Sequence, residues 1–191
     1  MNVEELLRQY QAGKRNFQQI DLAQVILKQA NLAQINFSQA ILSEADFTES
    51  NLSAANFERA NLDLSNFSQA QLTQADFNCA SMQSTLLYKA NLNQARLPKA
   101  NLRQAILQRT FLRSANLSQA NLIDANLSQA NLIDANLTGA NLTGANLDRA
   151  FLQGANLDRA CLDNANFHRA ILTGAIMPDG SIFKEPKITN H

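Results

Sequence analysis

Large apolar residues recur at every fifth position along most of the chain. From Phe17 to Met177, each such position holds Leu, Phe or Met, with no slip of register. Ala usually lies two residues before this central residue, and Asn or Asp usually lies one residue before it, as in Ala130-Asn131-Leu132. The chain is therefore built from a repeated five-residue unit, A-(N/D)-L-x-x.

A five-residue period fits neither of the two common secondary structures. On an α-helix, a step of five residues turns by about 500°, or ~140° beyond one full turn, so the central residues would scatter around the helix. On a straight strand, an odd step sends successive central residues to opposite faces. Both conflicts disappear if the chain bends after each unit, because every central residue then points toward one axis. About four bends would close a coil of about 20 residues.

Stacked coils of this kind predict an all-β solenoid. Each coil would pair its backbone with the coils before and after it, at the ~4.8 Å spacing of neighbouring strands. Residues 15–178 supply about eight such coils. Sorting the central residues by their place in the coil predicts two phenylalanine columns, one with Phe17, Phe37, Phe57 and Phe77 and the other with Phe47 and Phe67.

Residues 1–14 are expected to form a short α-helix that caps the stack. Their apolar residues have the spacing of one helical face: Val3, Leu6, Leu7 and Tyr10. Asn2 and Glu5 form a predicted capping box, and Gly13 marks the end of the helix. Because an open stack exposes unpaired backbone and an uncovered core, this helix should lie over the first coil.

Residues 179–191 are expected to form a C-terminal cap and tail. Pro178 ends the repeat, and an Asp-Gly turn follows it. Ile182 and Phe183 can then fold over the last coil. The final residues, from Lys187 on, are expected to be loose.

The residues expected at the corners change along the chain. If a corner runs from a central residue to the next Ala, the last residue of the unit takes the third turn position, where a type II turn requires positive φ. Glycine takes this position in four late units: Gly139, Gly144, Gly154 and Gly174. The first coils have glutamine there, which favours other turn types at Gln19, Gln24, Gln29, Gln34 and Gln39.

These units resemble the motif of the pentapeptide-repeat family, A-(D/N)-L-x-x. The resemblance implies a right-handed quadrilateral β-helix. The opening M-N-V-x-E-x-L-R-x-Y-x-A-G-K-R-N-F and the closing G-A-I-M-P-D-G-S-I are similar to those of cyanobacterial members. One of these members promotes heterocyst differentiation and is understood to bind a transcriptional regulator without catalysis.

The chain holds little material for catalysis, metal binding or a disulfide. It has only two Cys and two His. Cys79 and Cys161 are about four coils, or roughly 20 Å, apart along the axis, whereas a disulfide needs Cα atoms within about 7 Å. Neither His168 nor His191 has a second His or Cys nearby in the repeat. We therefore expect no catalytic residue, no bound metal and no cofactor.

The apolar residues are too dispersed for a membrane span. No run of about 18 to 20 consecutive apolar residues occurs in the sequence. The opening M-N-V-E-E has two acids where the apolar core of a secretory signal would lie. We therefore expect a cytoplasmic protein with reduced thiols.

Charge is balanced in total, with 16 basic and 16 acidic side chains, but it is unevenly distributed. Residues 21–76 carry seven acids against Lys28 and Arg59, and residues 77–123 carry no acid. The second segment has six cations: Lys89, Arg96, Lys99, Arg103, Arg109 and Arg113. These cations are expected on all four sides of the coil, whereas nucleic acid favours one continuous basic face, so we expect no nucleic-acid partner.

The repeat is least regular within this basic segment. Leu86, Ile106 and Phe111 replace the usual Asn or Asp, and Tyr88 takes an outward position. Apolar side chains flanked by positive charge are typical of protein interfaces. The predicted patch consists of Leu86, Tyr88, Lys89, Ile106, Arg109, Phe111 and Arg113. The alternative is a locally variant coil in which these side chains serve packing alone.

These patterns favour a non-enzymatic interaction protein, a monomer or weak homo-oligomer that presents a rigid surface to another protein. The resemblance implies a role in a cyanobacterium, in heterocyst differentiation. Two alternatives remain. Some pentapeptide proteins bind DNA gyrase by mimicking the width and charge of B-DNA, but that role needs an extended acidic surface. The other alternative is a structural repeat protein without a fixed partner.

Overall fold

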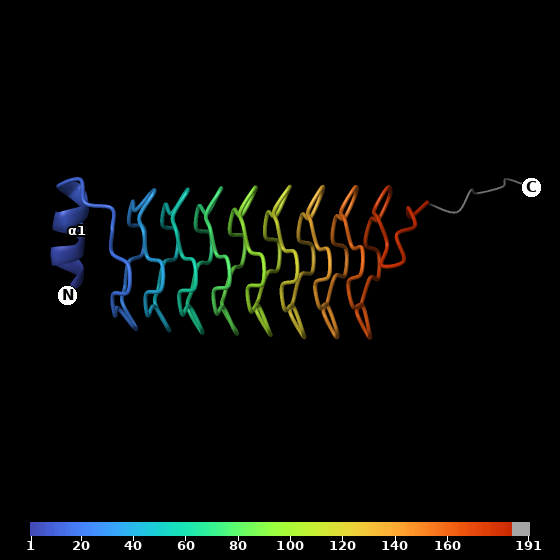
Figure 1. Ribbon diagram of the computed structural model, residues 1–191, viewed down its shortest axis with the longest axis horizontal. Coiled ribbons are helices and arrows are strands. Elements are labelled where there is room, and N and C mark those ends of the chain that lie inside the picture. The colour runs from blue at the N-terminus through green and yellow to red at the C-terminus, as the bar shows by residue number, and fades with distance from the viewer. Residues whose placement is uncertain (185–191) are drawn as a thin grey trace, which may run out of the picture.

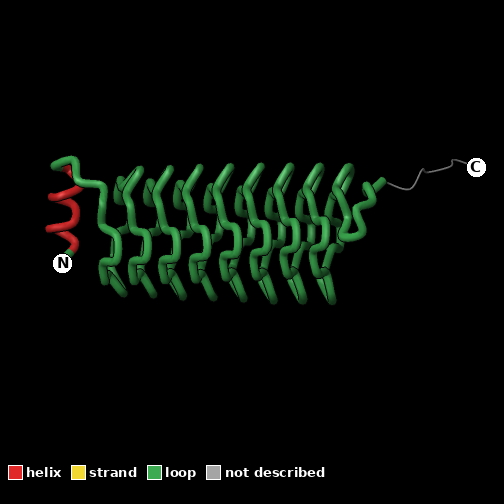
Figure 2. Tube along the Cα trace, in the orientation of Figure 1, coloured by secondary structure: helices red, strands yellow, loops and turns green. Residues whose placement is uncertain are grey.

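The computed structural model describes residues 1–184 as a rod with one helix at its N-terminal end (Figure 1). Helix α1 (Val3–Gln11) lies across the end of a long stack of coils. The rest of the described chain is drawn as loops and turns in Figure 2. No helix within residues 1–184 is long and apolar enough to cross a membrane. The expected loose segment from Lys187 to His191 lies outside the described residues.

Each residue directly before a central residue pairs with the residue 20 positions later. These parallel bridges run without interruption from Asn16 and Asn36 to Asn156 and Ile176. A backbone hydrogen bond accompanies each contact, as where Phe17 N–H donates to Asn36 O (2.8 Å). The coil of 20 residues expected from the sequence is confirmed, and eight steps of 20 residues separate Asn16 from Ile176.

The pairing does not extend into continuous strands, which differs from the expected all-β solenoid. All of the parallel contacts in residues 1–184 are isolated bridges. Two of the five residues in each unit belong to a turn, so the extended segment between corners is too short for several successive bridges. Short contacts repeated coil after coil therefore replace a sheet.

The corners share one backbone conformation along the whole stack. The residue at the Ala position donates to the carbonyl of the preceding central residue, as from Val25 to Leu22 (3.2 Å). The third turn residue has positive φ at every corner from Gln19 (57°) to Gly174 (75°). The expectation of other turn types in the first coils is therefore wrong, because φ lies between 57° and 61° at Gln19, Gln24, Gln29, Gln34 and Gln39.

Stacking explains why glutamine adopts a conformation that favours glycine. The amide of Gln19 donates to Ser38 O in the next coil (2.9 Å), and the same bond recurs at later corners. A different turn would remove this hydrogen bond and shift the register of the coil. The left-handed conformation costs a non-glycine residue about 1 to 2 kcal/mol. The stack therefore imposes the turn, and glycine only relieves its strain.

The central residues form a continuous core along the axis. Every central residue from Leu32 to Leu157 is fully buried. The expected phenylalanine columns are confirmed, because the Phe57 and Phe77 rings stack with centroids 5.0 Å apart, and other rings meet edge to face. Each buried side chain of this size contributes about 1.5 to 3 kcal/mol. The core, not the outer surface, therefore provides the stability of the rod.

Helix α1 covers the first coil, as expected. Leu6 is fully buried, and the Tyr10 hydroxyl donates to Ala33 O (2.8 Å), supplying a bond that corner amides supply elsewhere in the stack. At the helix start, the side chain of Asn2 accepts from Glu5 N–H (2.9 Å). Only this half of the expected capping box forms, because the Glu5 carboxylate accepts from Arg8 and Gln9 instead.

The C-terminal cap covers only part of the last coil. Phe183 packs against the core, and its amide donates to Ala175 O (2.8 Å). Ile182 pairs with Ile176 in an antiparallel bridge, but its own side chain is exposed, contrary to the expectation that it would cover the core. Central residues of the last coil therefore stay half-buried, among them Leu162 and Phe167.

Candidate functional site

The predicted patch wraps around one edge of the rod. Residues 86–90 and 106–110 belong to one side of two successive coils, which we call the Leu86 side. Residues 91–95 and 111–115 belong to the next side, which we call the Phe111 side. Each name includes the later units of the same columns, up to residues 166–170 on the Leu86 side and 171–175 on the Phe111 side. The corner between the two sides carries one outward residue per coil, namely Lys89, Arg109, Gln129, Arg149 and Arg169, and we call this column the basic edge.

The apolar residues of the patch on the Leu86 side lie together. Leu86 and Ile106 are joined by a parallel bridge, so their side chains are neighbours on successive coils, as expected. Leu86 is 40% exposed and Ile106 is half-buried. Most bridge positions hold Asn, whose side chain accepts from the backbone two residues on, as Asn126 does from Ser128. Leucine and isoleucine lack this acceptor, so they replace a local hydrogen bond with an apolar surface.

Tyr88 joins this apolar pair to the basic edge. Its hydroxyl accepts from Arg109 Nη1 (3.4 Å), and Lys89 Nζ lies 5.2 Å from the centre of its ring. Burial raises the pKa of Tyr88, but hydrogen bonds with Lys89 and Arg109, together with their positive charges, outweigh burial and lower it below its usual value. Arg109 Nε also donates to Gln129 Oε1 (3.0 Å). Two neutral groups, the Tyr88 hydroxyl and the Gln129 side chain, therefore hold Arg109 in place at the basic edge.

The last two patch residues lie around the corner. Phe111 is 47% exposed on the Phe111 side, between Asn91 and Asn131 on the neighbouring coils. Arg113 lies on the same side, with Nη2 3.7 Å from Asp134 Oδ2. The structure thus brings together Leu86 with Ile106 and Tyr88 with Lys89 and Arg109. It places Phe111 and Arg113 on the adjacent side, and the seven residues remain a prediction as a binding surface.

The positive charges of the basic segment are not equally available. Arg96 forms an ion pair with Asp76 (3.2 Å), and Arg103 forms one with Asp124 (3.7 Å). Within residues 1–184, Lys89 and Arg109 form no ion pair. Their charge is therefore presented to solvent rather than neutralised within the rod.

Sequence reasoning missed several residues that belong to the same columns. Arg149 and Arg169 continue the basic edge, and Phe151 and Ile171 continue the column of Phe111. In chain order, acids such as Asp148 lie next to these arginines and mask their charge. The arginines stand out only when outward residues are sorted by their place in the 20-residue coil.

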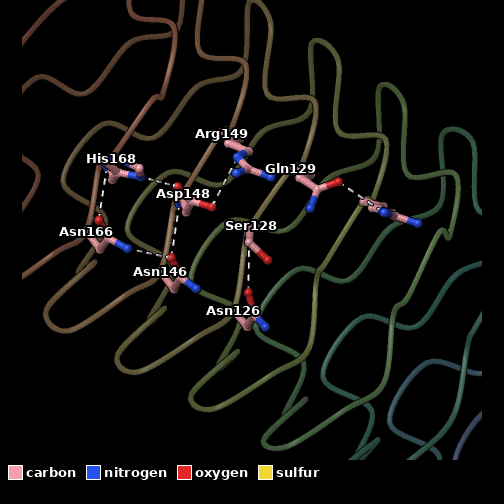
Figure 3. A network of polar contacts seen from close by, with 9 residues as sticks. Asn126, Ser128, Gln129, Asn146, Asp148, Arg149, Asn166 and His168 are labelled. Atoms are coloured by element: carbon pink, nitrogen blue, oxygen red, sulfur yellow. Dashed lines mark hydrogen bonds and ion pairs between the residues drawn. The ribbon is translucent and has the colours of Figure 1, made fainter.

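A polar network occupies the Leu86 side beyond the patch (Figure 3). Asp148 Oδ1 lies 2.8 Å from His168 Nδ1, and Asp148 Oδ2 lies 3.7 Å from Arg149 Nε. Beside them, Asn166 donates to the side chain of Asn146 on the preceding coil (3.0 Å). The Asp148–His168 and Asn166–Asn146 contacts link side chains of neighbouring coils, which is a structural role.

The structure offers no assembled group for metal chemistry in the part of the chain that it describes. No three His, Cys, Asp or Glu side chains gather there in a way that could hold a metal ion. Cys79 and Cys161 are both free, as their separation along the rod predicts.

Two family models match the chain. The model described as "Pentapeptide repeat region" matches residues 20–97. The model described as "Pentapeptide repeats (8 copies)" matches residues 85–122, 95–134 and 135–174. The comparison with curated proteins gave no match.

Solved structures with the same repeat are also similar. HetL, a pentapeptide repeat protein involved in heterocyst differentiation regulation from the cyanobacterium Nostoc sp. strain PCC 7120, is 34% identical, with 96% of this chain and 100% of HetL covered and a TM-score of 0.52. QnrB1, a plasmid-mediated fluoroquinolone resistance protein, is 21% identical, with 86% and 84% covered and a TM-score of 0.45. Rfr23 from the cyanobacterium Cyanothece 51142 is 21% identical, with 88% and 94% covered and a TM-score of 0.30.

Proposed function

Because the chain belongs to the pentapeptide-repeat family, we propose that it is a non-catalytic rod that binds another protein through the predicted patch. The patch comprises Leu86, Tyr88, Lys89, Ile106, Arg109, Phe111 and Arg113. Family membership also supports a right-handed, four-sided coil. The similarity to HetL over 96% of the chain supports a regulatory role in a cyanobacterium, in heterocyst differentiation. We propose the cytoplasm as its location, as in the sequence-based expectation.

The observation that carries this proposal is the exposure of large apolar groups beside unpaired cations. Phe111 is 47% exposed and Leu86 is 40% exposed, at positions where the repeat usually has Asn. Neither side chain belongs to the buried core, which the central residues fill together with the residues at the Ala position. Arg109 and Lys89 lie beside them without an acidic partner among the described residues. Exposed aromatic residues with adjacent arginine are enriched in the energetic centres of protein interfaces.

A double variant tests the proposal. Tyr88→Ala with Phe111→Ala removes two anchors from the two sides of the basic edge. We expect the variant to fold, because both side chains lie outside the core, and to lose partners that wild type retains from a cyanobacterial lysate. The matched control is Ile41→Ala with Leu64→Ala, which removes exposed apolar groups from the side of the rod opposite the Phe111 side. If the folded Tyr88/Phe111 variant retains every partner, the patch serves packing alone.

A further inference from the structure

We infer that the Phe111 side, from Phe111 to the last coil, is a docking surface, which we call the groove, for an acidic amphipathic helix of the partner. This inference rests on the proposed function, because it takes the chain to be a protein-binding rod. It extends the proposal by naming the form and charge of the bound segment. It also extends the surface to Phe151, Ile171, Arg149 and Arg169.

Exposed apolar side chains form a row along this side. Phe111, Phe151 and Ile171 are 47%, 40% and 38% exposed. They occupy one column, because parallel bridges connect position 111 to 131, 131 to 151, and 151 to 171. The described residues provide no cover for this row, which gathers three exposed apolar groups in one column, and apolar surface gathered on one side is a feature of interaction sites.

The row contains a notch and is bounded by one low edge. Asn131 interrupts the column between Phe111 and Phe151, so a smaller side chain separates the two rings. The corner on the far edge of this side has Gly154 and Gly174 in its last coils. The Asp134 carboxylate lies over Gly154, whereas nothing blocks the approach of another chain at Gly174. A partner side chain can therefore enter between the rings while its backbone passes over Gly174.

The other boundary of the groove carries positive charge. Arg109, Arg149 and Arg169 each precede an apolar residue of the row by two positions, namely Phe111, Phe151 and Ile171. Arg149 shares Asp148 with His168. Arg109 and Arg169 form no ion pair with any residue from 1 to 184. A partner helix with carboxylates along one flank would form ion pairs with these two arginines.

The spacing of the row fits an α-helix that runs along the rod. Phe111 and Phe151 are two coils, or about 9.6 Å, apart, and Phe151 and Ile171 are one coil, or about 4.8 Å, apart. On a helix, residues i and i+7 are about 10.5 Å apart along the axis, and residues i+7 and i+11 about 6 Å. Anchors at i, i+7 and i+11 therefore follow the row, and acids on one flank face the arginines.

A buried acceptor on the same side is consistent with a bound chain. Gln153 Oε1 is buried and has no hydrogen-bond partner among the described residues. A buried acceptor without a partner is destabilising, because its lost hydration is not replaced. Rotation of this side chain toward the groove would let it accept a hydrogen bond from a docked segment.

Binding of a synthetic helix tests the inference. The probe is a fluorescein-labelled peptide of about 18 residues with Leu at i, i+4, i+7 and i+11 and Glu along one flank, and a second peptide has Lys in place of Glu. Fluorescence anisotropy with the full chain should show binding of the acidic peptide only. Phe151→Asn with Ile171→Asn, and Arg149→Glu with Arg169→Glu, should each weaken binding by about tenfold or more.

Matched controls distinguish the groove from general attraction. Arg59→Glu with Arg159→Glu makes the same change of charge at a different corner column, and Ile41→Asn with Leu64→Asn removes apolar groups from the opposite side. Both controls should bind as wild type does. The inference is overturned if the acidic peptide does not bind, if the Phe151/Ile171 variant binds it normally, or if the controls weaken it equally.

Two further outcomes bear on the identity of the ligand and on the proposed function. Tighter binding of single-stranded oligothymidine, lost in the same Arg149/Arg169 variant, would replace the acidic helix by nucleic acid and overturn the inference. None of the groove variants changes a residue of the predicted patch. If the Tyr88/Phe111 variant loses its partners but wild type does not bind the peptide, the inference of a helix-binding groove is therefore overturned and the proposed function is not.

Discussion

The Asp134 carboxylate occupies the space that a side chain at residue 154 would need. A Cβ placed on Gly154 would lie 2.7 Å from Asp134 Oδ1, and Gly154 has a φ of +67°. The same carboxylate lies 3.7 Å from Arg113 in the coil before it. One residue of the predicted patch is therefore linked through an acid to a corner two coils further along the rod.

This relationship predicts that Gly154→Ala is more destabilising than Gly174→Ala. Both changes put a side chain on a left-handed residue, which costs about 1 kcal/mol. At Gly174 the nearest atom would be 3.9 Å from the new Cβ, whereas Asp134 must move aside at Gly154. Urea unfolding should show the difference, and adding Asp134→Ala to Gly154→Ala should remove it. Equal losses in the two single variants would contradict the contact.

The inward direction of the central residues predicts a contrast between neighbouring substitutions. Leu127 is fully buried, so Leu127→Asp places an unpaired charge in the core and should destabilise the rod by more than about 4 kcal/mol. Asn126→Asp keeps the oxygen that accepts from Ser128 N–H (3.0 Å) and should change stability by less than about 1 kcal/mol. Thermal melting followed by circular dichroism compares the two. Similar melting temperatures would be incompatible with an inward Leu127.

Asp46 predicts a small dependence of stability on pH. Burial raises the pKa of Asp46, but hydrogen bonds from Thr48 and the nearby Lys28 outweigh burial and hold this pKa below its usual value of 3.8. The stabilisation from Asp46 is therefore present above pH 3.8 and lost as the pH falls through the lower, folded-state pKa. Asp46→Asn should be less stable than wild type at pH 7, by under about 1 kcal/mol. The gap should close below pH 3.8, and a constant gap in urea unfolding would contradict this role.

The charge of the surface predicts that the chain does not inhibit DNA gyrase. A mimic of B-DNA needs a continuous acidic surface, but the basic edge carries Lys89, Arg109, Arg149 and Arg169 along one corner. These cations would repel the basic groove that binds DNA. A supercoiling assay with purified gyrase should show no inhibition at micromolar protein. Inhibition that weakens as salt rises would favour the gyrase-binding alternative instead.

The sequence predicts the core better than the surface. A period of five determines which residues point inward, so the stacked rings of Phe57 and Phe77 follow from counting alone. The turns at Gln19 and Gln24 could not be predicted from residue preference, because hydrogen bonds between coils impose a conformation that glutamine does not favour. Only Lys89 and Arg109 of the basic edge could be predicted from the sequence. Arg149 becomes a neighbour of the patch only when the coils are stacked.

Crosslinking from single positions tests the central claim, that the chain binds a protein through the patch around the basic edge. A photoreactive phenylalanine analogue replaces Tyr88, Phe111 or, as a control on the side opposite Phe111, Ile41. The folded proteins are then irradiated in a cyanobacterial lysate. The account predicts the same protein adduct from positions 88 and 111, competed by unlabelled wild type, and no such adduct from position 41. An adduct from position 41 with none from 88 and 111 would contradict it.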